Sequence, residues 1–265
     1  MSTSTDGRSE NRYNIRVLDR AFGVLALLSD GKPRSLQQLS QEMHLSPSTA
    51  FRQLASLAQY RYVERNGATG QYRLGVACLE LARAYSEADD LRRIAVPELE
   101  TLRDETRETV HLAVLDQMEI IYIEKLQGLH AIGLMGSRVG GRAPAFCTGV
   151  GKVLLAYQSA GIVKRYFQRR KLQRYTAQTI TTVKALTAEL EAIRSRGYAI
   201  DHGEHEAQVC CVAAPIFGLR GEVIAGLSIS GPAERMEPIE RNRKMIENAL
   251  LTAGRISASL GYSCP

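Results

Sequence analysis

The sequence lacks the features typical of membrane-spanning, exported and disulfide-stapled proteins. No apolar run approaches the ~20 residues needed to cross a bilayer, and the polar first residues hold no apolar signal-peptide core. Tryptophan is absent, and there is no low-complexity tract or internal repeat. The cysteines follow no framework spacing, and their odd number favours reduced thiols: Cys78, Cys147, Cys210, Cys211 and Cys264. We therefore expect a soluble, cytoplasmic protein with no membrane partner and no structural disulfide.

The charge is unevenly spread along the 265 residues. Residues 1–75 hold ten Lys and Arg against six Asp and Glu, whereas the remainder holds 24 against 22. Basic side chains near phosphates release condensed counterions, so a basic surplus on a small domain favours a polyanionic partner. The length suits one large domain or two ordinary ones, and this shift favours a separate N-terminal domain.

Three short helices are predicted in the first quarter of the chain. In the first, apolar residues recur at spacings of three and four on one stripe: Ile15, Leu18, Phe22, Leu25 and Leu28. Ser35 and Gln38 form a capping-box pattern at the start of the second helix. Ser46 and Pro47 are a typical helix start, so the third helix is expected at residues 47–59. Its buried side is predicted to hold Ala50, Phe51, Leu54, Leu57 and Ala58.

The opposite face of the third helix is polar and contains no acid: Ser48, Thr49, Arg52, Gln53 and Ser56. Such side chains donate and accept hydrogen bonds at base edges in the major groove, although a solvated face has the same composition. Strand-like runs at 62–65 and 71–74 flank a turn at 66–70, which predicts a wing hairpin. The order predicts a winged helix-turn-helix with DNA contacts from Ser35, Ser46, Ser48, Thr49, Arg52, Gln53, Arg65 and Arg73.

The N-terminal third contains a distinctive set of short runs. They are Gly31-Lys32-Pro33, Leu36-Gln37-Gln38-Leu39, Leu45-Ser46-Pro47-Ser48-Thr49-Ala50-Phe51-Arg52 and Gln71-Tyr72-Arg73-Leu74-Gly75. In these runs, and above all in Ser48, Thr49 and Arg52, the region resembles the winged-helix domain of the IclR family of bacterial transcriptional regulators.

Beyond residue 75 the patterns predict a mixed domain behind a linker. Residues 76–90 are rich in Ala, Leu and Glu, which predicts a linker helix rather than a flexible tether. Strands are predicted at 110–115, 119–125, 131–135, 198–201, 212–217 and 223–230, and helices at 97–107, from 149 onward, at 183–196 and at 238–260. This order favours a mostly antiparallel sheet. The predicted fold class is α+β, with a winged helix-turn-helix at 14–75 and a mixed α/β effector domain at 91–262.

The resemblance to the IclR family extends over nearly the whole chain. It is carried by runs such as Glu108-Thr109-Val110-His111-Leu112, Gly149-Val150-Gly151-Lys152, Arg196-Gly197-Tyr198-Ala199-Ile200-Asp201 and Ser228-Ile229-Ser230-Gly231-Pro232. The resemblance implies a GAF-like effector domain, with pocket residues at Met135, Gly149, Val150, Asp201, Cys211, Ser228 and Ser230. Where the family has an acidic pair and a Gly-x-Arg-Cys run, this chain has Gly203-Glu204 and Gln208-Val209-Cys210-Cys211, so the pocket loop is expected to differ.

Local patterns at these positions fit an acidic ligand. Thr148 is expected to cap the helix that follows it, leaving the backbone N–H groups of Val150 and Gly151 for a carboxylate. Ser228 and Ser230 are two apart on a strand, so their hydroxyls share one face. The remaining positions would supply an acceptor and apolar walls: Asp201, Met135 and Cys211. We predict a small organic acid of carbon catabolism as the effector, such as a keto acid, a sugar acid or an aromatic acid.

Other function classes have weaker support. Metal-ligand residue types cluster within ten positions, at His202, His205, Cys210 and Cys211. Adjacent strand cysteines point to opposite faces, whereas a structural zinc site needs four converging ligands. Residues 146–153 miss the P-loop pattern, His111 fits a hydrogen-bonded core residue better than a base, and no nucleophile motif is present. We therefore expect no enzyme activity, metal or cofactor; a cyclic-nucleotide sensor is the alternative, distinguished by pocket size and charge.

The predicted function is sequence-specific regulation of transcription under the control of that effector. One recognition helix reads too few base pairs for useful specificity, so we expect a symmetric oligomer on a near-palindromic operator in double-stranded DNA. The family resemblance implies a homodimer through the N-terminal domains and often a dimer of dimers, a homotetramer. The expected pairing surface is the outer side of the first helix with the linker helix around Leu79, Leu81, Ala82 and Tyr85, where packing within one chain is equally expected.

Overall fold

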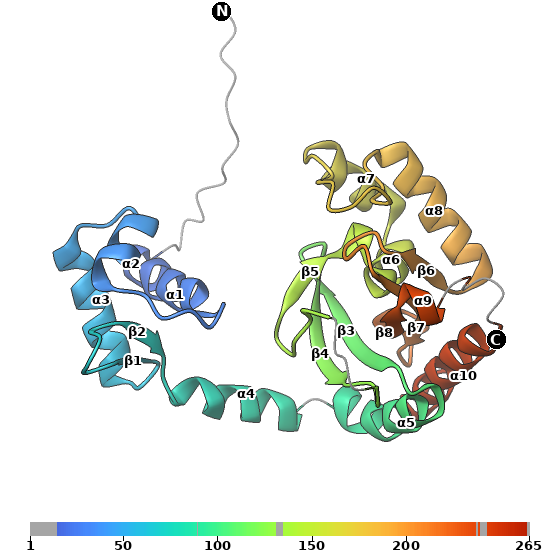
Figure 1. Ribbon diagram of the computed structural model, residues 1–265, viewed down its shortest axis with the longest axis horizontal. Coiled ribbons are helices and arrows are strands. Elements are labelled where there is room, and N and C mark those ends of the chain that lie inside the picture. Colours follow the sequence, from blue (N-terminus) through green and yellow to red (C-terminus); the bar gives the residue numbers. More distant parts are fainter. Residues whose placement is uncertain (1–14, 89, 131–134, 237, 239–242, 264–265) are drawn as a thin grey trace, which may run out of the picture. The chain divides into compact units, whose positions relative to one another are not determined.

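The N-terminal unit consists of the predicted helices and hairpin. The computed structural model describes residues 15–88, 90–130, 135–236, 238 and 243–263, in two compact units, Met1–Ala88 and Asp89–Pro265 (Figure 1). The first unit contains α1 (Arg16–Leu28), α2 (Leu36–Glu42), α3 (Pro47–Gln59), the antiparallel hairpin of β1 (Val63–Arg65) and β2 (Tyr72–Leu74), and α4 (Ala77–Ala88). Among the described helices, none has the length and apolar character of a membrane span.

Side-chain hydrogen bonds fix where two of these helices begin. The Gln38 N–H donates to Ser35 Oγ at 3.2 Å while the Ser35 N–H donates to Gln38 Oε1 at 2.8 Å, so the predicted capping box is present. Ser46 Oγ accepts the Thr49 N–H at 3.3 Å, with Pro47 at the first helical position. The start predicted for α3 is therefore confirmed.

Burial on α3 departs from the prediction. Its buried side chains recur at spacings of three and four: Ala50, Gln53, Leu54 and Leu57. Gln53 is 9% exposed and Phe51 is 52% exposed, so the orientations predicted for both are wrong. Ala58 is exposed as well. At roughly 100° per residue, a stripe centred near Ala50 brings Gln53 inward and leaves Phe51 at the flank.

The apolar stripe of α1 is only partly used by the core. Val24 and Leu28 are buried, whereas Ile15, Leu18 and Phe22 are 59%, 49% and 65% exposed. Of the predicted apolar stripe, only the second half packs into the core of the unit. The α1 residues that complete the core lie toward the end of the helix.

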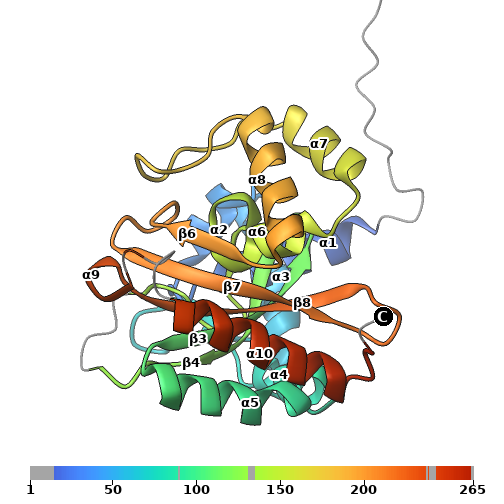
Figure 2. The same ribbon diagram turned by 90° about the vertical axis from the view of Figure 1, so that its right-hand side faces the viewer.

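The C-terminal unit is a six-stranded antiparallel sheet with helices on both faces. Its strands are β3 (Thr109–Asp116), β4 (Glu119–Leu126), β5 (Arg142–Pro144), β6 (Ala199–His202), β7 (Val209–Phe217) and β8 (Val223–Pro232), in the order β5-β4-β3-β8-β7-β6. One face packs on α5 (Asp90–Thr106) and α10 (Arg243–Ser259), the other on α6 (Gly149–Ala156), α7 (Ala160–Gln168) and α8 (Val183–Arg196) (Figure 2). The predicted α+β class with an antiparallel sheet is confirmed.

Several element boundaries differ from those predicted. The helix expected from Pro97 begins at Asp90, so Pro97 lies inside α5 and the predicted start is wrong. Four segments without a prediction form elements, namely β5, the 3-10 helix η1 (Ala145–Cys147), α7 and the short α9 (Ala233–Met236). The strand predicted at 131–135 and the helix at 238–260 fall partly outside the described residues, which leave out 131–134, 239–242 and Cys264. Because α4 belongs to the first unit, the three-part division at residues 75 and 90 stays a prediction.

Candidate functional site

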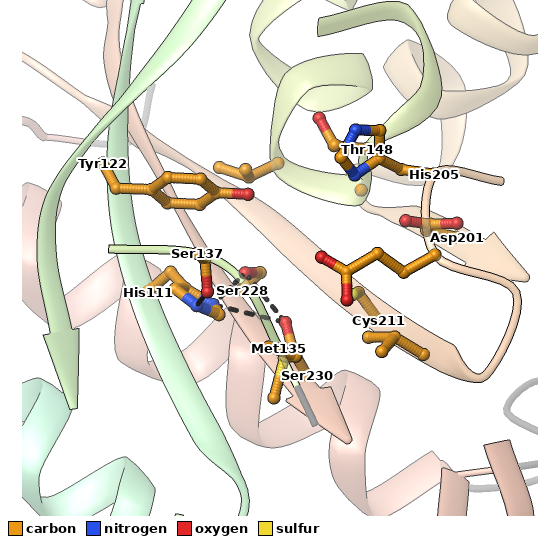
Figure 3. A pocket seen from close by; sticks show the side chains of 14 residues that line it. His111, Tyr122, Met135, Ser137, Thr148, Asp201, His205, Cys211, Ser228 and Ser230 are labelled. Carbon is orange, nitrogen blue, oxygen red and sulfur yellow. Dashed lines mark hydrogen bonds between the residues drawn. The ribbon is translucent and has the colours of Figure 1, made fainter. Parts of the chain in front are cut away.

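A pocket lies on the α6 face of the sheet in the C-terminal unit. Its cavity volume is about 40 Å³, and its lining comes from five strands, the start of α6 and two loops. The lining residues are His111, Tyr122, Met135, Ser137, Thr148, Gly149, Val150, Asp201, His205, Glu206, Val209, Cys211, Ser228 and Ser230. All seven residues predicted for the effector pocket are among them, so the structure brings them together (Figure 3). Their role in binding stays a prediction.

The start of α6 is arranged differently from the prediction. Thr148 is the N-cap residue, but its hydroxyl donates to the Pro144 carbonyl at 3.1 Å and caps no N–H, so the predicted side-chain cap is wrong. The Gly149 N–H donates to Asp201 instead. Gly151 packs against Ala145, where a Cβ would come within 2.4 Å of backbone atoms, and it does not line the pocket. Of the predicted ligand N–H groups, only that of Val150 belongs to a lining residue.

Asp201 is a buried carboxyl group in the pocket wall. It is 4% exposed, and Oδ1 accepts the Glu204 N–H at 2.8 Å in addition to the Gly149 N–H. Burial raises the pKa of Asp201 to about 7; the nearby Lys152 ammonium and the two N–H donors oppose this rise, and the Glu204 carboxylate adds to it. Near neutral pH the Asp201 carboxyl therefore exists in both protonation states.

A buried ion pair supports the loop behind Asp201. Lys152 is 1% exposed, and its ammonium donates to the Ile200 carbonyl at 2.7 Å and to the Glu204 carboxylate. Glu204 Oε2 is buried without a hydrogen-bond partner in the described part of the chain. The Thr179 hydroxyl donates to the Glu204 carbonyl at 2.6 Å. These bonds hold the 203–206 loop, which carries His205 and Glu206 into the pocket.

His111 organises the hydroxyl side of the pocket. Its Nε2 lies 2.9 Å from Ser137 Oγ, and its Nδ1 lies 3.4 and 3.3 Å from the hydroxyls of Ser228 and Ser230, which are themselves 3.3 Å apart. Burial lowers the pKa of His111 to about 3, so the ring is neutral. The predicted hydrogen-bonded role of His111 and the shared face of the two serines are confirmed.

Tyr122 supplies a hydroxyl to the pocket wall. Its ring lies 5.0 Å from the His111 ring, and its hydroxyl points into the pocket (Figure 3). No hydrogen bond joins that hydroxyl to another described residue, although the side chain is only 9% exposed. Burial raises the pKa of Tyr122, and the neighbouring acids Glu206 and Asp201 raise it further. The hydroxyl is therefore protonated and available as a donor.

The lining is acidic rather than basic. Asp201 and Glu206 carry carboxyl groups into it, and none of the described lining residues is Lys or Arg. A metal site has no support in the described ranges, which contain no group of three His, Cys, Asp or Glu side chains able to hold an ion. Cys211 lines the pocket whereas Cys210 packs in the core on the other face, as strand alternation predicts.

Sequence reasoning missed half of the pocket. The positions without a prediction as ligand contacts are His111, Tyr122, Ser137, Thr148, His205, Glu206 and Val209. Strand pairing brings two of them to the serines. His111 on β3 is paired with Ser228 on β8. Ala113, which lies on the same face of β3 as His111, is paired with Tyr122 on β4. That register depends on which strands are neighbours, and β3 pairs with β8 far along the chain.

The start of α3 presents an exposed polar surface. Ser48 and Arg52 are exposed and Thr49 is half-buried, while Ser46 Oγ lies within hydrogen-bond distance of the hydroxyls of Ser48 and Thr49. On the hairpin, Arg73 pairs with Glu64, and Arg65 lies over the Tyr72 ring at 5.9 Å. Ser35 is occupied by its capping box. In this conformation Gln53 is buried and presents little of its side chain to a ligand.

Comparison with known proteins covers both units. Residues 17–67 match the IclR helix-turn-helix domain, and residues 83–258 match the C-terminal domain of IclR bacterial transcriptional regulators. The HTH-type transcriptional regulator KdgR of Escherichia coli is 36% identical over 243 residues, or 92% of each chain. The crystal structure of Thermotoga maritima IclR covers 94% of this chain and 100% of its own, with 32% identity and a TM-score of 0.73.

A second similar structure contains a ligand. It is an IclR homologue from Microbacterium hydrocarbonoxydans complexed with 4-hydroxybenzoate, 29% identical, with a TM-score of 0.81. The match covers 93% of this chain and 100% of that protein.

Proposed function

The chain belongs to the IclR family of bacterial transcriptional regulators, and we propose that a small organic acid of carbon catabolism controls its binding to DNA. The regulator binds DNA through its helix-turn-helix domain and an effector through its C-terminal domain. The observation that carries the proposal is the pocket, whose lining brings together Ser228, Ser230, Tyr122 and Asp201. The 4-hydroxybenzoate in the Microbacterium homologue is itself a small carboxylic acid, which supports this class of effector.

The size of the cavity favours the smallest of the candidate acids. Its volume of about 40 Å³ is well below the ~150 Å³ of a cavity known to accept a benzene ring. A short keto acid therefore fits with less rearrangement than a sugar acid or an aromatic acid. A cyclic nucleotide fits least, because its bulk exceeds the cavity and its phosphate would face Asp201 and Glu206.

Four neutral donors are available to the acid. The hydroxyls of Ser228 and Ser230 adjoin one another, the Val150 N–H belongs to the first turn of α6, and the Tyr122 hydroxyl approaches from β4. With no lining Lys or Arg among the described residues, an anionic ligand avoids repulsion by Asp201 only when Asp201 carries a proton. We therefore propose that Asp201 binds the acid in its protonated form and donates a hydrogen bond to it.

The DNA contacts in this proposal come from the start of α3 and from the wing. Ser48, Thr49 and Arg52 enter the major groove. Ser46 positions the hydroxyls of Ser48 and Thr49 through its own hydroxyl. Arg65 and Arg73 contact phosphates or the minor groove. Ser35, the N-cap residue of α2, is proposed as a further DNA contact. Because of its burial, Gln53 is left out of the proposed contacts.

The regulator is proposed to act in the cytoplasm as a symmetric dimer, or a dimer of dimers, on a near-palindromic operator. The exposed apolar residues of α1 and α4 support a pairing surface: Ile15, Val17, Leu18, Phe22, Leu79, Leu81 and Tyr85. A monomer rarely exposes so many large apolar side chains on two helices. Effector binding would then act by a population shift, favouring one arrangement of the dimer over another.

A thermal-shift screen of small carboxylates tests the effector class. The variant Ser228→Ala/Ser230→Ala removes two hydroxyls from the pocket, whereas Ser159→Ala/Ser195→Ala removes two exposed hydroxyls from the same unit as a matched control. Acids that raise the melting temperature of the parent should do so equally in the control and less in the pocket variant. Undiminished shifts in the pocket variant would place the ligand elsewhere.

A further inference from the structure

One segment of the C-terminal unit is strongly basic. Residues 160–188, here called the basic segment, contain no acid and seven cations: Lys164, Arg165, Arg169, Arg170, Lys171, Arg174 and Lys184. The rest of the chain carries 27 Lys and Arg against 28 Asp and Glu. The basic segment therefore carries a surplus of +7, larger than the +4 of residues 1–75, and the remaining residues are net acidic.

The seven cations form an exposed and unneutralised surface. The basic segment comprises α7, the loop after it and the start of α8 (Figure 2). All seven of its cationic side chains are exposed. Within the described residues none of them makes an ion pair, whereas other arginines of the same unit do, such as Arg235 with Glu108 and Arg255 with Glu98. Neighbouring cations without counter-charges repel one another, and binding of an anionic partner relieves this repulsion.

Packing beneath the basic segment holds this surface in place. Val163, Phe167 and Leu172 are buried in the core of the unit, and the Phe146 and Phe167 rings meet edge to face at 5.8 Å. The buried apolar side chains of α7 are thus used within the fold, and the exposed Ile162 by itself does not make the broad apolar face that an interfacial helix inserts into lipid. The loop that follows forms a groove lined by Lys171, Leu172, Gln173, Arg174 and Thr181.

We infer that the basic segment is a second DNA-binding surface, which contacts the phosphates of duplex DNA without reading their sequence. Duplex DNA carries about one negative charge per 1.7 Å, a density that suits closely spaced cations. The helix-turn-helix domain already holds the chain on DNA, so phosphates of the same duplex are present at high effective concentration. An acidic protein surface offers neither this charge density nor this proximity.

The salt dependence of DNA binding measures this contact in the full-length protein. The variant K164Q/R165Q/R169Q/K171Q removes four exposed cations but leaves Arg170, which lies over the Tyr166 ring, and Arg174, which donates to two backbone carbonyls. The probe is a random-sequence duplex of about 60 base pairs, titrated at several salt concentrations. Each lost phosphate contact lowers the slope of log K against log salt by about 0.9, so the variant should lose roughly 2 to 4 in slope.

Two further variants separate a contact from a general effect of charge or folding. R93Q/R220Q/R243Q/K244Q removes four exposed cations from other parts of the same unit, and it should keep the parent slope. K164R/R165K/R169K/K171R keeps the charge and should also keep the slope, which shows that any loss is not caused by misfolding. Equal slopes in the parent and the glutamine variant would overturn the inference and leave an acidic protein as the partner. Equal losses in the glutamine variant and its control would overturn it as well.

Discussion

Binding of the acid should be coupled to the uptake of one proton by Asp201. At effective dielectric constants typical of proteins, two carboxylates about 4 Å apart repel by ~4 kcal/mol. Because the pKa of Asp201 is about 7, protonating its carboxyl at pH 8 costs only ~1.4 kcal/mol. Protonation is the smaller cost, so the anion should bind the protonated pocket.

The expected size of this effect follows from the protonated fraction of Asp201. That fraction is roughly 0.9 at pH 6 and roughly 0.1 at pH 8, so the apparent Kd should rise about tenfold between them. The acids in question remain ionised throughout this range. Isothermal titration calorimetry in buffers of different ionisation enthalpy reports both the Kd and the proton taken up.

Two variants test which carboxyl group takes up the proton. Asp201→Asn removes the titrating group and should give a Kd that is nearly the same at pH 6 and pH 8. Glu206→Gln removes the other lining carboxyl group and should keep the tenfold change. A parent Kd that is flat over this range, or a pH dependence that survives in Asp201→Asn, would refute the reasoning.

Four other outcomes are expected. Tyr122→Phe should weaken binding of a keto acid by ~1 kcal/mol but leave the matched acid without the keto oxygen unaffected, as measured by calorimetry; an equal loss for both ligands would mean that the hydroxyl does not distinguish them. Arg52→Ala should reduce the preference for operator over random DNA by ~1 to 3 kcal/mol, and an equal loss on both would indicate a phosphate contact only. Phe22→Glu should shift sedimentation toward the monomer at micromolar concentration, unless the parent is itself a monomer there. Lys152→Met leaves the Glu204 carboxylate buried and unpaired, so urea unfolding should show a loss of ~3 to 5 kcal/mol, and a loss under ~1 kcal/mol would contradict the role of this pair.

Elements defined by local sequence were predicted well. The helix α8 runs over the predicted residues 183–196 because Thr182 caps its start and Gly197, at a φ of 82°, ends it. The hairpin and the capping box at Ser35 follow from equally local chemistry. Pro97 misled the prediction because proline favours a helix start, whereas α5 accommodates it within the helix.

Features that depend on tertiary contacts were predicted less well. The inward orientation of Gln53 is set by the direction from which α1 and α2 pack on α3, which the polar character of the residue does not reveal. Tyr122 and His111 reach the pocket only because β3 lies between β4 and β8. The family resemblance supplied the seven predicted pocket positions, and strand pairing supplied the aromatic wall that it left out.

The most direct test of the account is a DNA-binding titration with and without the effector. The duplex comes from the region upstream of the gene for this protein, and the ligand is the carboxylate that gives the largest thermal shift. Fluorescence anisotropy should show that this acid changes the Kd for the duplex by at least about fivefold in the parent, and not in Ser228→Ala/Ser230→Ala. An identical Kd with and without a bound acid would contradict the claim that the pocket controls DNA binding.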